Sequence, residues 1–521
     1  MSPALGRTLE PSQVDTPERI VQPRAAQIEP DALAGLPRAE QARSERRGPM
    51  RPVDLTPTRS RLTGWMLGVI FRAADAFALL AIALASAALA TGELTAQSLA
   101  PFAVGALVML WSLSTLRAYG FAQREDLGRH LVKVAAGFGL AALIFELLLT
   151  GFRPATIAPR PFGLWFAGSF AAFYGLHMIW WAMVRRWRAK GRLTPNIVVV
   201  GATANAERLI AAALQSREVA VLGVFDDRIG RIPPDIAGVP MLGDTQALLN
   251  HRIMPYVDTV VIAVPQNAQA RVRQLIERLG VLPNQVMLFI DQGPASRAAA
   301  LSRITEAPLA PVSGEPSDER RAMVKRVQDL VVGALALVVA VPLMTLIALA
   351  IKLDSPGPVF FRQRRHGFNS EVILVWKFRS MRHASDAPGG GVRQIRFDDD
   401  RVTRVGKFIR RTSLDELPQL INVLKGEMSL VGPRPHAVGM KTGTTESAKL
   451  VAEYAHRNRM KPGMTGWAAI NGSRGPVDTP ELVRRRVALD IEYIERQSLM
   501  LDLMIMARTI PCLIGDRKTV R

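Results

Sequence analysis

Residues 325–352 read KRVQDLVVGALALVVAVPLMTLIALAIK, in which a long apolar run contains Pro342 near its middle. Cations flank this run on both sides: Arg320, Arg321, Lys325 and Arg326 before it, and Lys352, Arg362, Arg364 and Arg365 after it. Because Lys and Arg mark the cytoplasmic ends of membrane segments, neither end is expected to be translocated. The missing amide and the ring of a proline can bend a helix sharply. We therefore expect a re-entrant membrane helix over 323–353 that bends at Pro342; an ordinary fifth crossing with a tolerated proline is the alternative.

Four further apolar segments precede this run, near residues 66–90, 99–117, 131–150 and 162–184. Each is close to the roughly 20 residues that a helix needs to cross the hydrocarbon core. Cations gather at the flanks that would then be cytoplasmic: Arg59 and Arg61, then Arg117, Arg124, Arg129 and Lys133, then Arg185, Arg186, Arg188, Lys190 and Arg192. We expect a four-helix transmembrane domain over 61–190. Arg72 and Asp75, three residues apart, are expected to pair near the interface, and a functional relay that includes Glu146 is the alternative.

The composition agrees with a membrane protein that meets anionic partners. Of the 521 residues 49% are hydrophobic, and 66 Lys and Arg against 45 Asp and Glu give a formal charge of +21. Charge alone does not choose among lipid headgroups, phosphates and nucleic acid. The single cysteine, Cys512, excludes an internal disulfide framework and a cysteine metal cluster. Residues 1–60 are rich in Pro, Arg, Glu and Gln, which predicts a disordered cytoplasmic tail.

A small α/β domain of Rossmann type is expected over 191–300. Residues 196–201 are typical of a buried strand that enters a turn, followed by a helix near 205–215 and strands near 219–225, 258–263 and 286–290. Only Gly201 remains of the glycine triplet that a dinucleotide site requires. Asp226 and Asp227 end a strand and could accept a ribose hydroxyl, but a strand-ending turn explains them equally well. Residues 301–322 are expected to form a linker.

The segment 354–521 contains a series of ordered motifs: QRRHG at 363–367, WKFRSM at 376–381, RVGK at 404–407, TSLDELPQL at 412–420, GEMSLVGPRP at 426–435 and KPGMTGW at 461–467. Together they closely resemble the bacterial sugar transferase family, the monotopic phosphoglycosyl transferases, over about residues 320–515. The four preceding segments and the Rossmann-like domain resemble the long form of that family. The expected fold class is therefore a membrane protein of α plus α/β type, in which the re-entrant helix leads into a mixed α/β catalytic domain over 354–521.

The resemblance implies transfer of a hexose 1-phosphate from a UDP-sugar to undecaprenyl phosphate, the priming step of exopolysaccharide or O-antigen synthesis. It implies glucose before galactose as the donor sugar. It also implies that Asp415 is the nucleophile, which forms an aspartyl phosphosugar, and that Glu416 helps to hold Mg²⁺. The residues allow this chemistry, because adjacent carboxylates in a first helical turn can stay ionised and bind a divalent cation. The alternative is a Ser413 to Glu416 capping box without catalysis, although Pro418 suggests a distorted helix start.

Cations near these carboxylates are candidates for binding phosphate. Arg434 lies between Pro433 and Pro435, and its planar fork suits a phosphate. Further candidates for phosphate or lipid headgroups are Lys377, Arg379, Arg404, Arg457, Arg459 and Lys461. Any of these can instead be a solvated charge. Trp467 is expected either to stack on uridine or to anchor at the membrane interface.

Two other classes of protein remain as alternatives. A membrane-bound nucleotide-sugar dehydratase would require a Tyr-x-x-x-Lys pair, and none of the five tyrosines has Lys four residues later. A non-catalytic assembly platform would use the α/β domain to recruit a partner. The family resemblance instead favours a multi-pass protein of the bacterial inner membrane, with a cytoplasmic catalytic domain and no nucleic-acid partner. A homodimer is one option for its assembly.

Overall fold

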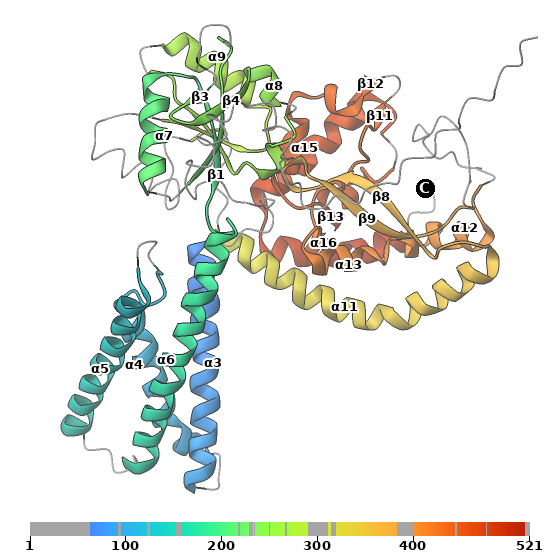
Figure 1. Ribbon diagram of the computed structural model, residues 1–521. Helices are drawn as coiled ribbons and strands as arrows, with labels where there is room; N and C mark the ends of the chain where they lie inside the picture. Colours follow the sequence, from blue (N-terminus) through green and yellow to red (C-terminus); the bar gives the residue numbers. More distant parts are fainter. Residues whose placement is uncertain are drawn as a thin grey trace, which may run out of the picture.

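The computed structural model describes the chain in segments: residues 63–91, 95–121, 125–152, 159–216, 219–228, 233, 235–249, 251–265, 268–289, 311–313, 319–382, 401–442, 445–475 and 477–515. The predicted tail over 1–60 lies outside them. Three parts follow one another along the chain: a bundle of long helices, an α/β domain, and a third part that begins with one very long helix (Figure 1). The third part includes the segment 354–521 that the sequence predicts to be catalytic, and it is called the catalytic part below.

The bundle consists of α3 (Gly64–Thr91), α4 (Ala96–Thr115), α5 (Leu127–Phe152) and α6 (Pro159–Ala189). Trp165, Phe173 and Leu113 pack in its interior, whereas Phe77 and Leu107 are largely exposed. Apolar side chains on the outside of a bundle indicate contact with lipid. By length and composition α3, α5 and α6 can cross a membrane, and α4 contains a shorter apolar stretch over 99–115. The predicted four-helix membrane part is thus confirmed as a set of apolar helices.

The expected pair between Arg72 and Asp75 is wrong. Asp75 is fully buried and instead accepts a hydrogen bond from Tyr119 Oη at 2.8 Å. Arg72 is exposed, and its Nε donates to Gly68 O, four residues earlier on α3. Asp75 points into the bundle and Arg72 points to its surface. The partners of Asp75 come from other segments of the chain, which the spacing of residues along α3 does not reveal.

The α/β domain contains one seven-stranded sheet in the order β3-β4-β2-β1-β5-β6-β7. Its strands are β1 (Asn196–Val200), β2 (Ala220–Phe225), β3 (Asp235–Ile236), β4 (Val239–Gly243), β5 (Thr259–Ile262), β6 (Gln285–Leu288) and β7 (Pro311–Ser313). The five central strands are parallel, and β3 and β7 pair antiparallel at the two edges. Helices α7 (Ala204–Ser216), α8 (Thr245–Leu249) and α9 (Gln269–Leu279) complete the Rossmann-like layer, with the short helix η3 (Met254–Tyr256) before β5. Strand β7 lies in the segment 301–322 that we expected to be only a linker.

The catalytic part starts with α11 (Glu319–Asp354), which curves below the other elements of this part (Figure 1). The helix is continuous through Pro342 and curves gradually, so the sharp bend expected at this proline is not observed. After it come β8 (Phe360–His366), η4 (Phe368–Ser370), β9 (Val372–Phe378), α12 (Arg404–Arg411), η5 (Leu414–Glu416), α13 (Gln419–Lys425) and β10 (Ser429–Val431). The chain continues with β11 (Lys441–Thr442), β12 (Thr445–Glu446), η6 (Ser447–Lys449), η7 (Ala452–Arg459), β13 (Gly463–Thr465), α14 (Trp467–Ile470), α15 (Pro480–Arg496) and α16 (Leu499–Gly515). Strands β8 and β9 form an antiparallel hairpin, and β10 pairs parallel with β13.

Both ends of α11 are attached to the same domain. Near its start Lys325 pairs with Asp502 at 2.8 Å, and Asp329 Oδ1 accepts hydrogen bonds from Ser429 Oγ and Leu430 N at 2.9 Å. At its last residue Asp354 accepts a hydrogen bond from the amide of Val405 at 3.2 Å. Helix α11 therefore returns to the domain from which it starts.

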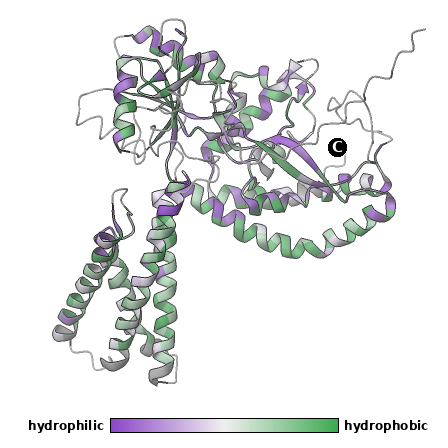
Figure 2. Ribbon diagram, in the orientation of Figure 1, coloured by the Kyte–Doolittle hydropathy of each residue, from purple (hydrophilic) through white to green (hydrophobic). Residues whose placement is uncertain are grey.

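The two faces of α11 differ in their contacts. Met344, Ile347 and Ile351 are buried against the domain, whereas Val339 and Leu353 are 74% and 80% exposed. Apolar residues make up the long middle of the helix, and hydrophilic residues lie at its two ends (Figure 2). An apolar face that the described residues leave uncovered is typical of a membrane contact.

The α/β domain contacts the catalytic part. The side chain amide of Asn369 donates to Met254 O at 2.9 Å and to Val257 O at 3.0 Å. His456, from η7, contacts Gly280 O. These contacts bring the α/β domain against the two short helices η4 and η7.

Candidate active site

The carboxylates of the TSLDELPQL motif lie in a strained turn. Ser413 has a left-handed backbone (φ 57°, ψ 17°), and Leu414–Glu416 then form the short 3-10 helix η5. The Ser413 side chain makes no cap hydrogen bond, so the capping box that we weighed as the alternative is absent from this turn. A left-handed non-glycine residue is costly and is frequent at active sites. Pro418 then precedes α13, as expected for a distorted helix start.

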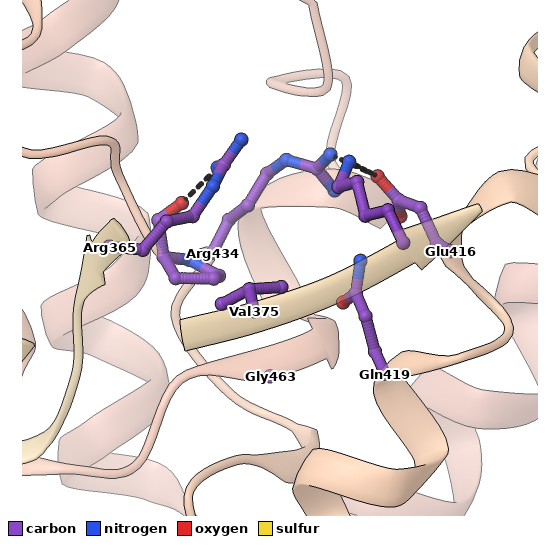
Figure 3. Close-up of a pocket in the computed structure, with 8 residues that line it drawn as sticks. Arg365, Val375, Glu416, Gln419, Arg434 and Gly463 are labelled. Carbon is purple, nitrogen blue, oxygen red and sulfur yellow. Dashed lines mark hydrogen bonds and ion pairs between the residues drawn. The ribbon is translucent and has the colours of Figure 1, made fainter. Parts of the chain in front are cut away.

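Glu416 is the anion at the centre of a small ionic cluster (Figure 3). Its Oε1 lies 2.9 Å from Lys377 Nζ and 2.7 Å from Arg434 Nη2. Lys377 Nζ is also 3.9 Å from Asp415 Oδ2. Asp415 and Glu416 are each 8% exposed. The structure thus brings together four of the predicted residues, two carboxylates and two cations, from β9, η5 and the loop after β10.

Burial and charge act differently on the two cations. Burial lowers the pKa of the Lys377 ammonium, and the carboxylates of Glu416 and Asp415 oppose this effect. The Glu416 carboxylate raises the pKa of Arg434, against burial. Arg434 is therefore a permanent cation, whereas Lys377 is the group of the cluster that is easier to deprotonate.

A pocket opens beside this cluster. It is lined by Arg365, Val375, Lys377, Glu416, Gln419, Arg434, Pro435 and Gly463. Figure 3 shows the side chains of Arg365 and Arg434 extending above β9, and the side chain of Gln419 reaching up to the strand from the helix below. Arg365 and Gln419 were missed as site residues. Both belong to motifs that the sequence displays, QRRHG and TSLDELPQL, so motif membership was the signal that could have found them.

Neighbouring contacts fix the elements that carry the cluster. Asn422, on α13, accepts from Trp376 N at 3.0 Å and donates to Leu374 O at 2.8 Å. It thereby fastens α13 to β9, the strand that carries Lys377. Gly463 approaches Gly432 so closely that an added Cβ would lie 2.1 Å from Gly432 N. A glycine is required there because any side chain would push the start of β13 away from the segment that follows β10.

The loop that carries Arg434 is held from behind by a buried cation. Arg457 is 2% exposed, donates to Arg434 O at 2.7 Å and forms an ion pair with Asp490 at 2.6 Å. His436 also contacts Arg457, and burial holds the pKa of His436 well below its usual value. Arg457 was a candidate for phosphate in the sequence. The structure places its guanidinium inside the protein, where it supports the loop.

Four other predicted cations are not among the pocket residues. Arg379 donates to Ser355 O at 2.7 Å and to Pro356 O, and so closes the C-terminal end of α11. Arg404 is exposed at the start of α12. Arg459 is partly buried near Glu495, and burial lowers its pKa. The ammonium of Lys461 lies near Gly426, at the end of α13. Trp467 donates to Glu492 Oε2 at 3.0 Å and is not a pocket residue either.

The donor set at Asp415 and Glu416 is compatible with Mg²⁺. The ion prefers hard oxygen ligands, and one or two carboxylates often hold it together with waters and substrate phosphates. Among the described residues no group of three His, Cys, Asp or Glu side chains forms a complete metal cage. Glu416 Oε1 is engaged with two cations, so an ion here would depend on the remaining carboxylate oxygens and on the phosphates of a substrate.

Comparison with known proteins agrees with this site. Residues 320–516 match the bacterial sugar transferase family, and residues 130–289 match a family described as a CoA-binding domain. A UDP-glucose:undecaprenyl-phosphate glucose-1-phosphate transferase of Xanthomonas campestris pv. campestris is 36% identical over 370 residues, which is 68% of this chain and 74% of the relative. The chain belongs to the bacterial sugar transferase family. The ionic cluster, with all of its four residues, lies inside the matched region of this sugar transferase.

Two further relatives show how the similarity is distributed. A protein of the same name from Escherichia coli (strain K12) is 40% identical over 292 residues, covering 56% of this chain and 61% of the relative. The exopolysaccharide production protein PSS of Rhizobium leguminosarum bv. phaseoli is 48% identical over 188 residues, 36% of this chain and 94% of the relative. About a third of the sugar transferase chain thus matches this relative over nearly its whole length.

In the α/β domain of the sugar transferase, a side chain of the domain itself occupies the turn after Gly201. Asp226 Oδ2 accepts a hydrogen bond from Ala202 N at 2.7 Å, and Arg228 pairs with the same carboxylate oxygen at 2.9 Å. In a dinucleotide-binding fold the amides of this turn face the pyrophosphate. Here the first of them is bonded to a carboxylate, which agrees with the degenerate glycine motif.

Proposed function

We propose that this sugar transferase moves a hexose 1-phosphate from a UDP-sugar to undecaprenyl phosphate and so starts a repeat unit of exopolysaccharide or O-antigen. The observation that carries the proposal is the pair of carboxylates, Asp415 and Glu416, held beside Lys377 and Arg434 at the wall of one pocket. The names of the relatives give the same donor and acceptor classes.

In the first step an oxygen of Asp415 attacks the β-phosphorus of the UDP-sugar. A bond forms between that oxygen and phosphorus, the bond from phosphorus to the bridging oxygen breaks, and uridine monophosphate leaves. Lys377 and Arg434 stabilise the charge that develops on the phosphate oxygens. Glu416 orients both cations through its Oε1.

In the second step a phosphate oxygen of undecaprenyl phosphate attacks the aspartyl phosphosugar. The bond between Asp415 and phosphorus breaks, the lipid-linked diphosphosugar leaves, and the carboxylate is regenerated. Asp415 and Glu416 are the residues that would hold Mg²⁺ together with the substrate phosphates, and the ion would supply further positive charge at the transferring group.

The site lies on the cytoplasmic side in this proposal. A helix that crossed the membrane would separate Asp329 from Asp354, yet both bind elements of one domain, β10 and α12. The catalytic part therefore lies on a single side of the membrane, and α11 enters and leaves on that side. With the four bundle helices crossing, the chain returns to the side from which it started, where UDP-sugars are made.

Adduct formation tests the nucleophile. Full-length protein in lipid nanodiscs is given UDP-glucose without lipid acceptor, and its intact mass is measured. We expect a hexose-phosphate adduct that disappears in Asp415→Asn and persists in Glu453→Gln, an exposed carboxylate of η7. An adduct of equal yield in Asp415→Asn would remove Asp415 from this role, and a transfer reaction without any adduct would remove the two-step mechanism.

Release of uridine monophosphate tests the donor sugar and the class of function. With undecaprenyl phosphate present, UDP-glucose should be used faster than UDP-galactose, and a reversed order would change the sugar and leave the transfer mechanism intact. A protein that served only as an assembly platform would release no nucleotide with any UDP-sugar.

Cysteine labelling tests the topology. In a Cys512→Ser background, Thr95→Cys marks the connection between α3 and α4, and Lys352→Cys marks the end of α11. A membrane-impermeant maleimide should label the first variant in intact cells and the second only after permeabilisation. Labelling of Lys352→Cys in intact cells would show that α11 crosses the membrane.

A further inference from the structure

A chain of hydrogen bonds joins two carboxylates through two histidines inside the four-helix bundle. His177 Nε2 lies 3.2 Å from Asp75 Oδ2, His177 Nδ1 lies 3.0 Å from His130 Nε2, and His130 Nδ1 lies 3.3 Å from Glu125 Oε1. Asp75, His130 and His177 are 0% exposed, and the side chain of Glu125 is 4% exposed. This chain connects α3, α5 and α6 with the segment before α5, and it shares no residue with the transfer site.

The geometry fixes how many protons this chain of hydrogen bonds holds. Each of the three contacts is a hydrogen bond only if one proton lies between its two atoms. A neutral imidazole carries one N–H, so two neutral rings supply two protons and leave one contact between two acceptors. Three hydrogen bonds therefore require a third proton. Without it, a ring lone pair would face a carboxylate or the other ring in a buried site.

The surrounding donors favour the rings as the place of the third proton. Tyr119 Oη donates to Asp75 at 2.8 Å, and Trp180 Nε1 donates to the same carboxylate at 3.3 Å. Lys133 Nζ lies 2.9 Å from Glu125 Oε1. Hydrogen bonds and a cation at a carboxylate favour its ionised form. The third proton then makes one imidazolium, shared by two rings between two anions.

Other charged groups lie around this chain of hydrogen bonds. Lys133 pairs with Glu125, and Arg188, which donates to Phe121 O, also interacts electrostatically with Glu125. Both cations favour the ionised form of Glu125, which leaves the third proton on the rings. Arg72 is exposed, donates to Gly68 O and lies over the Tyr119 ring at 5.8 Å. Arg129 and Asp126, at the start of α5, form a pair in which both side chains are mostly exposed.

We propose that the bundle of this sugar transferase contains a proton-binding site: one proton, carried as an imidazolium shared by His130 and His177 between Asp75 and Glu125, and needed for the tight packing of α3, α5 and α6. The residues of this site are separate from those of the transfer site, Asp415 and Glu416.

Nitrogen NMR of histidine counts the protons directly. The protein has seven histidines, so full-length protein labelled with ¹⁵N-histidine in nanodiscs gives few ring signals. The variants His130→Gln and His177→Gln assign the four ring-nitrogen signals of this pair. At neutral pH three of the four ring nitrogens of this pair should carry a proton. Raising the pH should convert both rings together to two protonated nitrogens. Two neutral rings that stay unchanged down to pH 5, or two rings that titrate independently, would overturn the proposal.

Stability gives a second readout. The unfolded chain releases this proton at the ordinary histidine pKa of about 6.5. The unfolding equilibrium constant of the bundle should therefore rise up to about tenfold for each pH unit between that value and the NMR step, and stay constant above the step. His130→Gln should remove this dependence, whereas His251→Gln, in the α/β domain, should retain it. A wild-type bundle whose stability stays constant over the pH range below the NMR step would refute the link to packing. If His130→Gln fails to fold, the wild-type proton count and its own pH dependence still decide the question.

Discussion

The buried pair of Arg457 and Asp490 gives the sharpest prediction about the active site. Arg457→Met leaves the Asp490 carboxylate buried without its partner and removes the donor to Arg434 O. Breaking a buried ion pair in this way costs about 3–5 kcal/mol. Each kcal/mol lowers the melting temperature of a domain of this size by about 2–4 °C. We therefore expect the catalytic part to melt about 6–20 °C lower.

A double variant separates stability from positioning. Arg457→Met with Asp490→Leu removes both charges, and apolar replacement of a buried pair is often neutral. The net charge beside Arg486 is unchanged, because one cation and one anion are lost. The carbonyl of Arg434 still has no donor from position 457. If that hydrogen bond positions Arg434 in the transition state, its loss of about 1–3 kcal/mol lowers kcat about 5- to 150-fold.

The assay combines thermal unfolding in nanodiscs with the rate of uridine monophosphate release. We expect the single variant to be unstable and slow, and the double variant to regain most of its stability and remain slow. Arg484→Met is the control, because Arg484 lies on α15 like Asp490, is 61% exposed and pairs with Glu481 at the surface. A double variant that recovers both stability and kcat would refute positioning. A single variant that melts normally would refute the energetic argument.

Three further changes have distinct expected outcomes. Burial lowers the pKa of Lys377, so this side chain loses its proton at a lower pH than an exposed lysine does. The value of kcat/KM should therefore begin to fall at a lower alkaline pH than an exposed lysine would cause. Lys377→Arg should move this fall to higher pH. Arg379→Ala should lower the melting temperature through a loss of about 1–3 kcal/mol at the end of α11 and leave KM for the UDP-sugar unchanged, whereas a raised KM at unchanged stability would make Arg379 a phosphate ligand. Pro342→Leu restores the missing amide and should straighten α11. Spin labels at positions 331 and 353 would then be farther apart. An unchanged distance between the labels would assign the curvature to the contacts at the two ends of α11.

Much of the architecture could be predicted because its signals are local. Apolar runs of membrane length gave the bundle helices, and the buried strand ending at Gly201 indicated the parallel sheet. The carboxylates Asp415 and Glu416 and the cations Lys377 and Arg434 were also predicted from motifs, and the structure brings them together. For these features the residue type and its neighbours in the sequence are sufficient to predict the element or the role of the side chain.

The remaining roles depend on partners that are distant in the chain. Arg379 and Arg434 are equally plausible phosphate ligands in the sequence, yet Arg379 folds onto carbonyls 23 and 24 residues earlier and Arg434 onto Glu416. Asp75 has an arginine three residues away, but its partner His177 lies 102 residues further along the chain. Spacing predicts pairs on one helix and contains no information about which helices meet.

The buried charges of this protein lie at the junctions between its parts. Asp329 and Lys325 fix the start of α11, Arg457 fixes the loop of Arg434, and the histidine chain connects three membrane helices. Thr63, directly before α3, donates to Glu319, the first residue of α11, at 2.8 Å. A change of packing in α3 can therefore reach α11, whose inner face supports α13 and the active-site turn. Because an unpaired buried charge is costly, these pairs favour one relative placement of membrane helices and catalytic loops over others.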